Sequence, residues 1–311
     1  MKALITGISG LAGSYLADRL IRERFEVFGL DVVPPSGSVR SVVFHQGDVT
    51  DNGALLRVFE EVMPDFIIHL ASIGLTEKQR RITEEIYSIN ILGTLNVFES
   101  VLKTDVDCRI LVTGSSAAYG FTPKGENPIK ESNLLRPINH YGTSKASQDM
   151  LGYQYWKGFD LKIIRTRTFN NTAPGESPDF VCSGFAKQIA QMEKGLIEPV
   201  INVGNLSPVR DFTDTRDVIE GYFLLLIKGI PGEAYNICSG IGVSIKQILG
   251  ILGELSEVSF QIRQAKERTR AIDVPLQIGD YSKMEKLTGW RPRIELRRTL
   301  ADILDYWRTR V

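Results

Sequence analysis

A tyrosine and a lysine placed four residues apart are the first candidates for chemistry in this chain of 311 residues. In the segment HYGTSK they are Tyr141 and Lys145, and on a helix this spacing puts both side chains on one face. A phenol whose pKa is near its ordinary value of about 10 is a poor base at neutral pH. An adjacent ammonium favours the phenolate and lowers that pKa, so the pair is suited to proton transfer.

The same spacing occurs again at Tyr153 and Lys157, so spacing alone does not select the reactive pair. In open parallel sheets, ligands bind outside the carboxyl ends of the strands and therefore near the amino ends of the helices that follow. Tyr141 opens its expected helix, whereas Tyr153 lies about 18 Å further along at a rise of ~1.5 Å per residue. We interpret the second pair as structural. For the first pair, the alternative is an ordinary helix start with an exposed tyrosine.

Short apolar runs alternate with longer helical patterns through the first half of the chain. Runs such as VFGL, FIIHL, RILV and KIIR are nearly continuous, as in strands that are buried on both faces. The alternation predicts an α/β fold, a doubly wound parallel Rossmann sheet with a smaller C-terminal α/β cap. The expected strands are 2–5, 26–30, 42–45, 65–70, 109–112 and 161–166, and the expected helices are 11–22, 52–62, 82–102, 141–156 and 181–193.

The segment TGISGLAG places three glycines between the first expected strand and the helix that begins at Leu11. A tight glycine turn at a helix N-terminus lets a pyrophosphate approach the backbone closely. Gly7, Gly10, Leu11 and Gly13 are therefore candidates for binding a dinucleotide. The alternative is a set of glycines that only packs the helix.

Two carboxylates follow the next expected strands. Asp31 ends the second strand, where it can accept hydrogen bonds from an adenosine ribose and would repel a 2′-phosphate. We therefore expect NAD(H) to be favoured, with NADP(H) possible. In GDV, after the third strand, Asp48, followed by Val49, could meet the adenine, and a simple turn is the alternative.

With a dinucleotide bound, the tyrosine and lysine pair acquires a specific use. Lys145 could hold the nicotinamide ribose while Tyr141 passes a proton to or from a sugar hydroxyl as hydride is transferred. The strand at 109–112 leads into TGSS, so Ser115 or Ser116 could give a second hydrogen bond to the same oxygen.

The sequence pattern changes after Thr168, where FNNTAPGESPDF is typical of a loop and the regular alternation stops. We therefore expect residues 1–170 to form an NAD(P)-binding Rossmann domain, to which the chain returns at about 211–238. Residues 171–311 are expected to form mainly a substrate-binding domain, in the two parts 171–210 and 239–311.

Composition excludes several classes of function. The 37 basic and 37 acidic residues cancel, so no overall basic field attracts nucleic acid or an anionic membrane. No run of about 18 apolar residues predicts a membrane span, and MKALITGISG lacks the apolar run of a signal peptide. The three cysteines have no metal-like spacing, so no metal site is expected. We expect a soluble cytoplasmic protein.

At the level of motifs the chain resembles the extended short-chain dehydrogenase/reductase family, whose members act on nucleotide sugars. The resemblance covers essentially the whole chain and rests on the glycine loop, GDV, HLAS, NILGT, TGSSAAYG, YGTSK and the loop 170–175. Four later motifs narrow the resemblance to one branch of this family: GNLSPVRDFTDTRDV, YNICSGIGVSI, RAIDVP and GWRPRIELRRTL. They are most similar to the branch of GDP-mannose 4,6-dehydratases and GDP-4-keto-6-deoxy-D-mannose reductases, and the reductases are the closer match.

The resemblance implies roles for individual residues. Tyr141 would be the catalytic acid/base, Lys145 its partner and Ser115 the hydroxyl that contacts the substrate. Leu70 and Ala71, in HLAS, would join the cofactor-binding residues. The implied substrate-binding residues are Ser116, Asn170, Arg210 and Arg270.

The two arginines of that set would clamp the diphosphate, because guanidinium groups match phosphate oxygens. The alternative for Arg210 is a surface salt bridge with Asp211 or Asp214. The alternative for Arg270 is a solvated, charged face.

Two departures from the family pattern shape the functional hypotheses. Ala117 stands where dehydratases of this branch carry an acid, and Asp31 stands where reductases that use NADPH tend to have basic or neutral residues. The first hypothesis is reduction of the C4 keto group of a GDP-4-keto-6-deoxyhexose with NAD(P)H. The alternative is a nucleotide-sugar 4-epimerase of the UDP-glucose 4-epimerase type with retained NAD, and a third possibility is a non-catalytic nucleotide-binding protein. Dehydratase activity is not expected.

The two long helices expected at 82–102 and 141–156 would in this family pair with a second subunit as a four-helix bundle. FESVL and MLGYQYW offer more apolar surface than one sheet face needs, so a homodimer is predicted. The charged loop from Gly74 to Glu85 receives no function.

Overall fold

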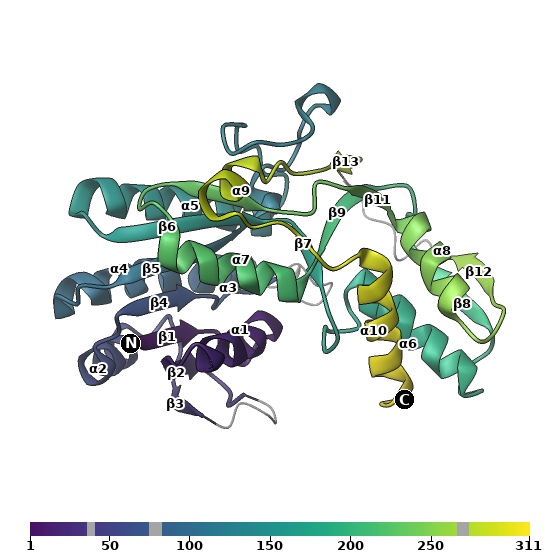
Figure 1. Ribbon diagram of the computed structural model, residues 1–311, viewed down its shortest axis with the longest axis horizontal. Helices are drawn as coiled ribbons and strands as arrows, with labels where there is room; N and C mark the ends of the chain where they lie inside the picture. The colour runs from purple at the N-terminus through teal and green to yellow at the C-terminus, as the bar shows by residue number, and fades with distance from the viewer. Residues whose placement is uncertain (36–40, 75–82, 266–273) are drawn as a thin grey trace.

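The computed structural model describes residues 1–35, 41–74, 83–265 and 274–311. Most of the charged loop Gly74–Glu85 and the arginine expected at position 270 therefore lie outside the described residues. Figure 1 shows a large sheet with its covering helices, and a smaller group of helices and short strands beside it.

The large sheet has seven parallel strands in the order β10-β6-β5-β4-β1-β2-β3. Its strands are β1 (Lys2–Thr6), β2 (Glu26–Asp31), β3 (Val42–Gln46), β4 (Phe66–His69), β5 (Arg109–Ser115), β6 (Lys162–Thr168) and β10 (Ala234–Ile237). From β1 the chain moves outward to β3 and then crosses back to β4, so the order reverses between β1 and β4. In doubly wound sheets ligands bind at this switch point, and the predicted fold class is confirmed.

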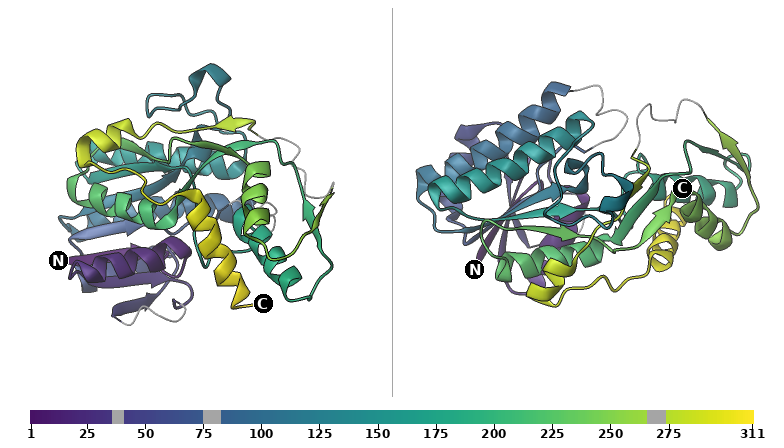
Figure 2. Two further views of the ribbon diagram at one scale, coloured as in Figure 1. Left: turned by 45° about the vertical axis from the view of Figure 1, so that its right-hand side comes forward. Right: turned by 90° about the horizontal axis from the view of Figure 1, so that it is seen from above.

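Helices cover both faces of this sheet (Figure 2). One face carries α1 (Leu11–Arg22) and α7 (Thr215–Lys228), which share a core with Leu16, Leu20 and Leu225. The other face carries α2 (Asn52–Val62), α4 (Gly93–Thr104) and α5 (His140–Phe159), with Phe59 and Phe98 in their core. Helices α1, α2 and α4 bury mainly apolar residues on the sheet, and this produces the periodic pattern seen in the sequence. The buried face of α5 differs, because it includes the polar residues Lys145, Gln148 and Asp149.

The single helix expected at 82–102 is a partly wrong prediction. The structure has α3 (Thr83–Tyr87), then the π-helical turn η2 (Ser88–Leu92), and then α4. A π turn inserts an extra residue and often lies at a functional site. Here it carries the buried Asn90, whose side-chain amide bonds to both backbone groups of Ile73, accepting at 2.8 Å and donating at 3.2 Å.

The smaller group of elements begins one residue after β6, with a short strand inside the segment that was expected to be a loop. A four-stranded sheet contains β7 (Asn170–Thr172), β9 (Val209–Asp214), β11 (Gly242–Ser244) and β13 (Leu276–Gln277), and β8 (Val200–Val203) pairs with β12 (Gln261–Gln264). Helices α6 (Val181–Glu193), α8 (Ile245–Leu255) and α10 (Leu296–Arg308) share a separate core, while α9 (Ser282–Thr288) packs on α7. The chain returns to the large sheet through α7 and β10, and the division into two domains stays a prediction.

Local capping explains several helix boundaries. The Asp51 carboxylate accepts from the Ala54 backbone N–H at 3.0 Å and starts α2, and Ser244 starts α8 in a capping box with Gln247. Within the described ranges, no helix combines the length and apolar character needed to cross a membrane.

Candidate active site

The first turn of α5 lies directly against the carboxyl end of β5. Asn139 caps the helix, and its side-chain oxygen accepts from the Gly142 N–H at 2.8 Å. A Cβ on Gly142 would stand 2.5 Å from the Ala117 carbonyl oxygen, so only glycine lets the helix approach the turn η3 (Ser116–Ala118) this closely. This approach brings Tyr141 next to Ser115, the last residue of β5.

Ser115 hydrogen-bonds to Tyr141 through its side chain, and its hydroxyl oxygen accepts from the Ala117 N–H at 3.1 Å. The hydroxyl is therefore oriented by backbone on one side and faces the phenol on the other. The structure brings the predicted hydroxyl residue and the predicted acid/base together.

Lys145 lies one turn further along the same face of α5 and is only 2% exposed. Its ammonium nitrogen is 6.0 Å from the centre of the Tyr141 ring. It donates to the Thr113 carbonyl oxygen at 3.0 Å and to the Gln148 side-chain oxygen at 2.9 Å. Burial lowers the pKa of Lys145 to about 7, because a charged ammonium is unfavourable away from water.

The expectation that Lys145 lowers the pKa of Tyr141 is not met in this structure. Burial raises the pKa of Tyr141 above its ordinary value, and the hydrogen bond from Ser115 opposes that rise. The physical reason is that burial also acts on the lysine, which is only about half charged at pH 7 when its pKa is about 7. The phenol therefore stays protonated at neutral pH.

The glycine loop lies at the start of α1, at the switch point of the sheet. Gly7 has a φ of +75°, and a Cβ there would lie 2.6 Å from the Ala71 backbone nitrogen. At Gly13 a Cβ would lie 2.5 Å from the Ile8 carbonyl oxygen. Gly10 is exposed and would meet only the Gly7 carbonyl oxygen at 3.4 Å, so its backbone can be approached from outside. These residues fit a dinucleotide at the helix N-terminus.

The other predicted cofactor-binding residues surround this loop. Both oxygens of Asp31 accept backbone hydrogen bonds, from Ser9 at 2.9 Å and from Val32 at 2.8 Å. The carboxylate is thus fixed between the glycine loop and the end of β2. The remaining members are Leu11 at the first position of α1, Leu70 and Ala71 after β4, and Asp48 and the buried Val49 after β3.

The predicted substrate-binding residues are less closely grouped. The buried Ser116 hydroxyl donates to the Gln277 side-chain oxygen at 3.2 Å, so it faces β13. Asn170 donates to the Asp211 carbonyl oxygen at 3.3 Å, and Arg210 donates to the Val209 carbonyl oxygen at 2.9 Å. Strand pairing nevertheless places Arg210 directly opposite Gln277 in the four-stranded sheet.

The alternative partners considered for Arg210 have other contacts. Asp211 accepts from the backbone and hydroxyl of Ser239 at 2.7 and 2.6 Å. Asp214 pairs with Arg216 at 2.7 Å.

A buried polar network behind Lys145 was missed by sequence reasoning. It contains Gln148, Thr94 and His69, all with no exposed surface. The His69 ring hydrogen-bonds to the Thr6 hydroxyl at 2.7 Å and to the Thr94 hydroxyl at 2.9 Å. Gln148 lies three residues after Lys145, on the same face as the reactive pair, and this spacing was a usable signal.

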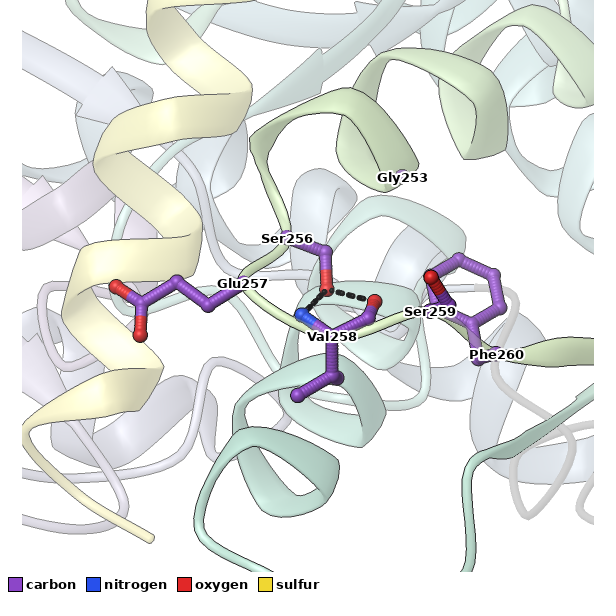
Figure 3. A pocket seen from close by; sticks show the side chains of 6 residues that line it. All are labelled: Gly253, Ser256, Glu257, Val258, Ser259 and Phe260. Atoms are coloured by element: carbon purple, nitrogen blue, oxygen red, sulfur yellow. Dashed lines mark hydrogen bonds between the residues drawn. The ribbon is translucent and has the colours of Figure 1, made fainter.

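A surface hollow lies elsewhere, between the end of α8 and β12 (Figure 3). Its lining includes Ser256, Val258 and Phe260, and the Ser256 hydroxyl bonds to both backbone groups of Val258. None of the predicted site residues lines it, and we assign it no function.

The fold and the motifs together define a Rossmann-fold enzyme of the short-chain dehydrogenase/reductase class. A family model described as GDP-mannose 4,6 dehydratase matches residues 4–303. The chain therefore belongs to the GDP-mannose 4,6 dehydratase family, and the resemblance seen in the motifs is confirmed.

Two curated relatives match over most of their length. The chain is 30% identical over 310 residues to GDP-6-deoxy-D-mannose reductase of Pseudomonas aeruginosa, covering 100% of this chain and 98% of the relative. It is 32% identical over 292 residues to GDP-6-deoxy-D-talose 4-dehydrogenase of Aggregatibacter actinomycetemcomitans, covering 93% of this chain and 92% of the relative.

Solved structures show the same similarity. The structure of RMD from Pseudomonas aeruginosa, complexed with NADPH, has a TM-score of 0.89 and 29% identity and covers 100% of this chain and 99% of its own. UDP-glucose 4-epimerase of Thermus thermophilus, in complex with NAD, has a TM-score of 0.90, 24% identity and full coverage of both chains, a likeness of fold.

Proposed function

We propose that this protein reduces the C4 keto group of a GDP-4-keto-6-deoxyhexose with a nicotinamide cofactor. The observation that carries the proposal is the contact of Ser115 with Tyr141, beside the buried Lys145, at the switch-point edge of the sheet. The two curated relatives support the substrate class, since one is named as a reductase and the other as a 4-dehydrogenase of GDP-linked 6-deoxy sugars.

The reduced cofactor, when bound, would supply the hydride to C4. Tyr141 would donate its phenolic proton to the oxygen on C4, and Ser115 would hydrogen-bond to the same oxygen. The raised pKa of Tyr141 keeps the phenol protonated at neutral pH, which is the form that a reduction requires. Lys145 would bind the nicotinamide ribose with its remaining donor.

NAD(H) is the cofactor we favour, with NADP(H) as the alternative. The Asp31 carboxylate is held by two backbone N–H groups at the end of β2. A fixed negative charge at this position would repel a 2′-phosphate and accept hydrogen bonds from the ribose hydroxyls. NADP(H) is kept as the alternative because the similar structure of RMD is a complex with NADPH.

We do not expect 4,6-dehydratase activity from this member of the family. Ala117 occupies the position of the acid that dehydratases of this branch use, and a methyl group cannot accept a proton. The alternative that we retain is a 4-epimerase with firmly held NAD, because Asp31 is equally suited to a retained NAD. The two activities differ in whether added cofactor is consumed.

One assay separates these possibilities. The purified protein is incubated with GDP-4-keto-6-deoxymannose and either NADH or NADPH, and absorbance at 340 nm is followed. We expect a stoichiometric decrease that is faster with NADH, and Tyr141→Phe should slow it by about 10²–10⁴-fold. No decrease with either cofactor, together with NAD released on extraction and interconversion of C4 epimers, would favour the epimerase.

We also propose a homodimer formed through α4 and α5. Met150 and Phe159 of α5 are 66% and 49% exposed, and Leu92, the residue before α4, is 53% exposed. Phe98 and Val101 of the segment FESVL are buried within the subunit, so the apolar surface expected there is not available. A second copy of the same face would bury the three exposed side chains in a four-helix bundle. Sedimentation that shows only monomer at micromolar concentration would exclude the homodimer.

The cytoplasmic location of the protein stays a prediction.

A further inference from the structure

Three polar side chains follow one another along the buried face of α5. Tyr141, Lys145 and Gln148 are spaced by four and then three residues, which keeps them on one stripe of a helix. Gln148 has no exposed surface, and both ends of its amide are bonded. Its oxygen accepts from the Lys145 ammonium at 2.9 Å, and its nitrogen donates to the Thr94 hydroxyl at 2.8 Å.

The donors and acceptors of this network fix the orientation of the Gln148 amide. When Lys145 is protonated its ammonium can only donate, so the Gln148 oxygen must face it. The Thr94 hydroxyl has one proton, which it gives to the Asn90 carbonyl oxygen at 2.7 Å, and it therefore accepts from the Gln148 nitrogen.

The same count fixes the tautomer of His69. Its Nε2 must donate to Thr94, because the Thr94 proton is already used, and its Nδ1 must accept from the Thr6 hydroxyl. Burial lowers the pKa of His69 to about 3, so the imidazole is neutral and the network has one arrangement.

Gln148 and the backbone together use two of the three Lys145 donors. The Thr113 carbonyl at 3.0 Å takes one N–H and the Gln148 oxygen takes another. Among the described residues no protein acceptor takes the third, which leaves it for a ligand. Without Gln148, the ammonium would be held at one point and could rotate about it.

We propose that Gln148 is the positioning residue of Lys145: its amide oxygen, locked by Thr94, fixes the ammonium so that one N–H is presented to the cofactor. This inference deepens the proposed function, on which its catalytic meaning rests. Gln148 itself does not touch the reacting atoms.

Few titratable groups face Lys145, so Gln148 is the main side chain through which its pKa can be changed. Among the described residues, they are Tyr141 on α5 and the neutral His69 on β4, while β5 and α4 present the Thr113 carbonyl and the Thr94 hydroxyl. The neighbouring Asp149 is bonded to Arg165 and Arg167, at 2.6 and 2.9 Å.

The test measures the protonation of Lys145 without any cofactor or substrate. Protein labelled with nitrogen-15 at lysine is titrated by NMR, and the Lys145 side-chain signal is assigned by its loss in Lys145→Met. Gln148→Leu removes the acceptor at similar volume, Gln148→Glu replaces it with a charged one, and Ser147→Ala is the matched control. Ser147 lies next to Gln148 but donates to the Thr143 carbonyl oxygen at 3.0 Å.

We expect Gln148→Leu to lower the titration midpoint of Lys145 by about one to two pH units, since a hydrogen bond to a charged group is worth that much. Gln148→Glu should raise the midpoint by at least about one unit, because a carboxylate stabilises the ammonium. Ser147→Ala should leave it unchanged. Midpoints equal to that of the wild type in both Gln148 variants would overturn the proposal, and if the leucine variant does not fold, the glutamate variant decides alone.

A second measurement connects this result with catalysis. In the keto-reductase assay, Gln148→Leu should raise the KM for NADH about tenfold and shift the pH profile, whereas loss of packing alone would lower activity without moving the profile. If no keto sugar is reduced by the wild type, the proposed function fails, and the NMR titration still tests Gln148 on its own. An unchanged profile in an active Gln148→Leu enzyme would count against positioning.

Discussion

The two ends of α5 carry the same tyrosine and lysine spacing but have opposite environments. Near the start of α5, Lys145 is 2% exposed and is bonded to Thr113 and Gln148. Further along, Tyr153 is 49% exposed, its ring lies 5.4 Å from the Arg165 guanidinium, and Lys157 lies over the Trp156 ring at 5.5 Å. The same tyrosine and lysine spacing is therefore expected to be reactive only where the fold buries it at the ligand-binding edge of the sheet.

The largest difference between the two ends of α5 is expected when the phenol oxygen of each tyrosine is removed. Tyr141→Phe should lower kcat for reduction of the keto sugar by about 10²–10⁴-fold, the usual contribution of a positioned acid. Tyr153→Phe, the matched control, should stay within about twofold of the wild type. Equal rates for the two variants in the 340 nm assay would remove the basis for the proposed site.

The second-largest difference is expected between variants of the two lysines, Lys145 and Lys157. Lys145→Met should lower kcat/KM for NADH by about 10²-fold, because it removes the charge-assisted hydrogen bond proposed to hold the nicotinamide ribose. Lys157→Met makes the same substitution at an exposed position and should leave kcat/KM for NADH unchanged. A similar loss in both variants would show that the spacing, and not the burial, is what matters.

The two lysines should also differ in how stability depends on pH. Burial lowers the pKa of Lys145 to about 7 in the folded protein, whereas an unfolded lysine titrates near 10.4. Between these pH values the unfolded chain binds more protons, so the free energy of unfolding rises with pH, by at most about 1.4 kcal/mol per unit. Relative to Lys145→Met, the wild type should gain stability from pH 7 to pH 10 in urea unfolding, and Lys157→Met should show no such difference. A constant gap between wild type and Lys145→Met would mean that the lysine is not buried in solution.

The smallest effect is expected at the cofactor edge, away from α5. Asp31→Asn keeps the shape of the side chain and removes the charge that would repel a 2′-phosphate. The ratio of kcat/KM for NADH to that for NADPH should fall about tenfold, with little change in kcat. An unaltered ratio would show that Asp31 does not determine the preference for NADH over NADPH.

Much of the large sheet was predictable because its signals are local. The bounds of α1, α2 and α6 agree with the sequence analysis, and the glycine loop and the Asp51 cap both act within a few residues. The positions of Tyr141 and Ser115 could be predicted for the same reason, since Ser115 ends a strand and Tyr141 opens a helix. Their catalytic roles stay a prediction.

The parts that escaped prediction depend on contacts between distant elements. The π turn at Asn90 cannot be seen in the periodicity, because a single extra residue leaves the apolar pattern nearly unchanged. The role of Gln148 becomes visible only when α4 is known to pack on α5, and Ser116 turns to Gln277 across 161 residues of chain. The upward shift in the pKa of Tyr141 follows from burial, which spacing does not report.

The amide of Asn90 has a mechanical consequence. It grips Ile73 in the segment after β4 and donates to the Ser144 hydroxyl at 2.9 Å, which in turn donates to the Tyr141 carbonyl oxygen at 2.8 Å. One side-chain amide therefore joins the segment after β4, which lies against the glycine loop, to the helical turn that carries the phenol.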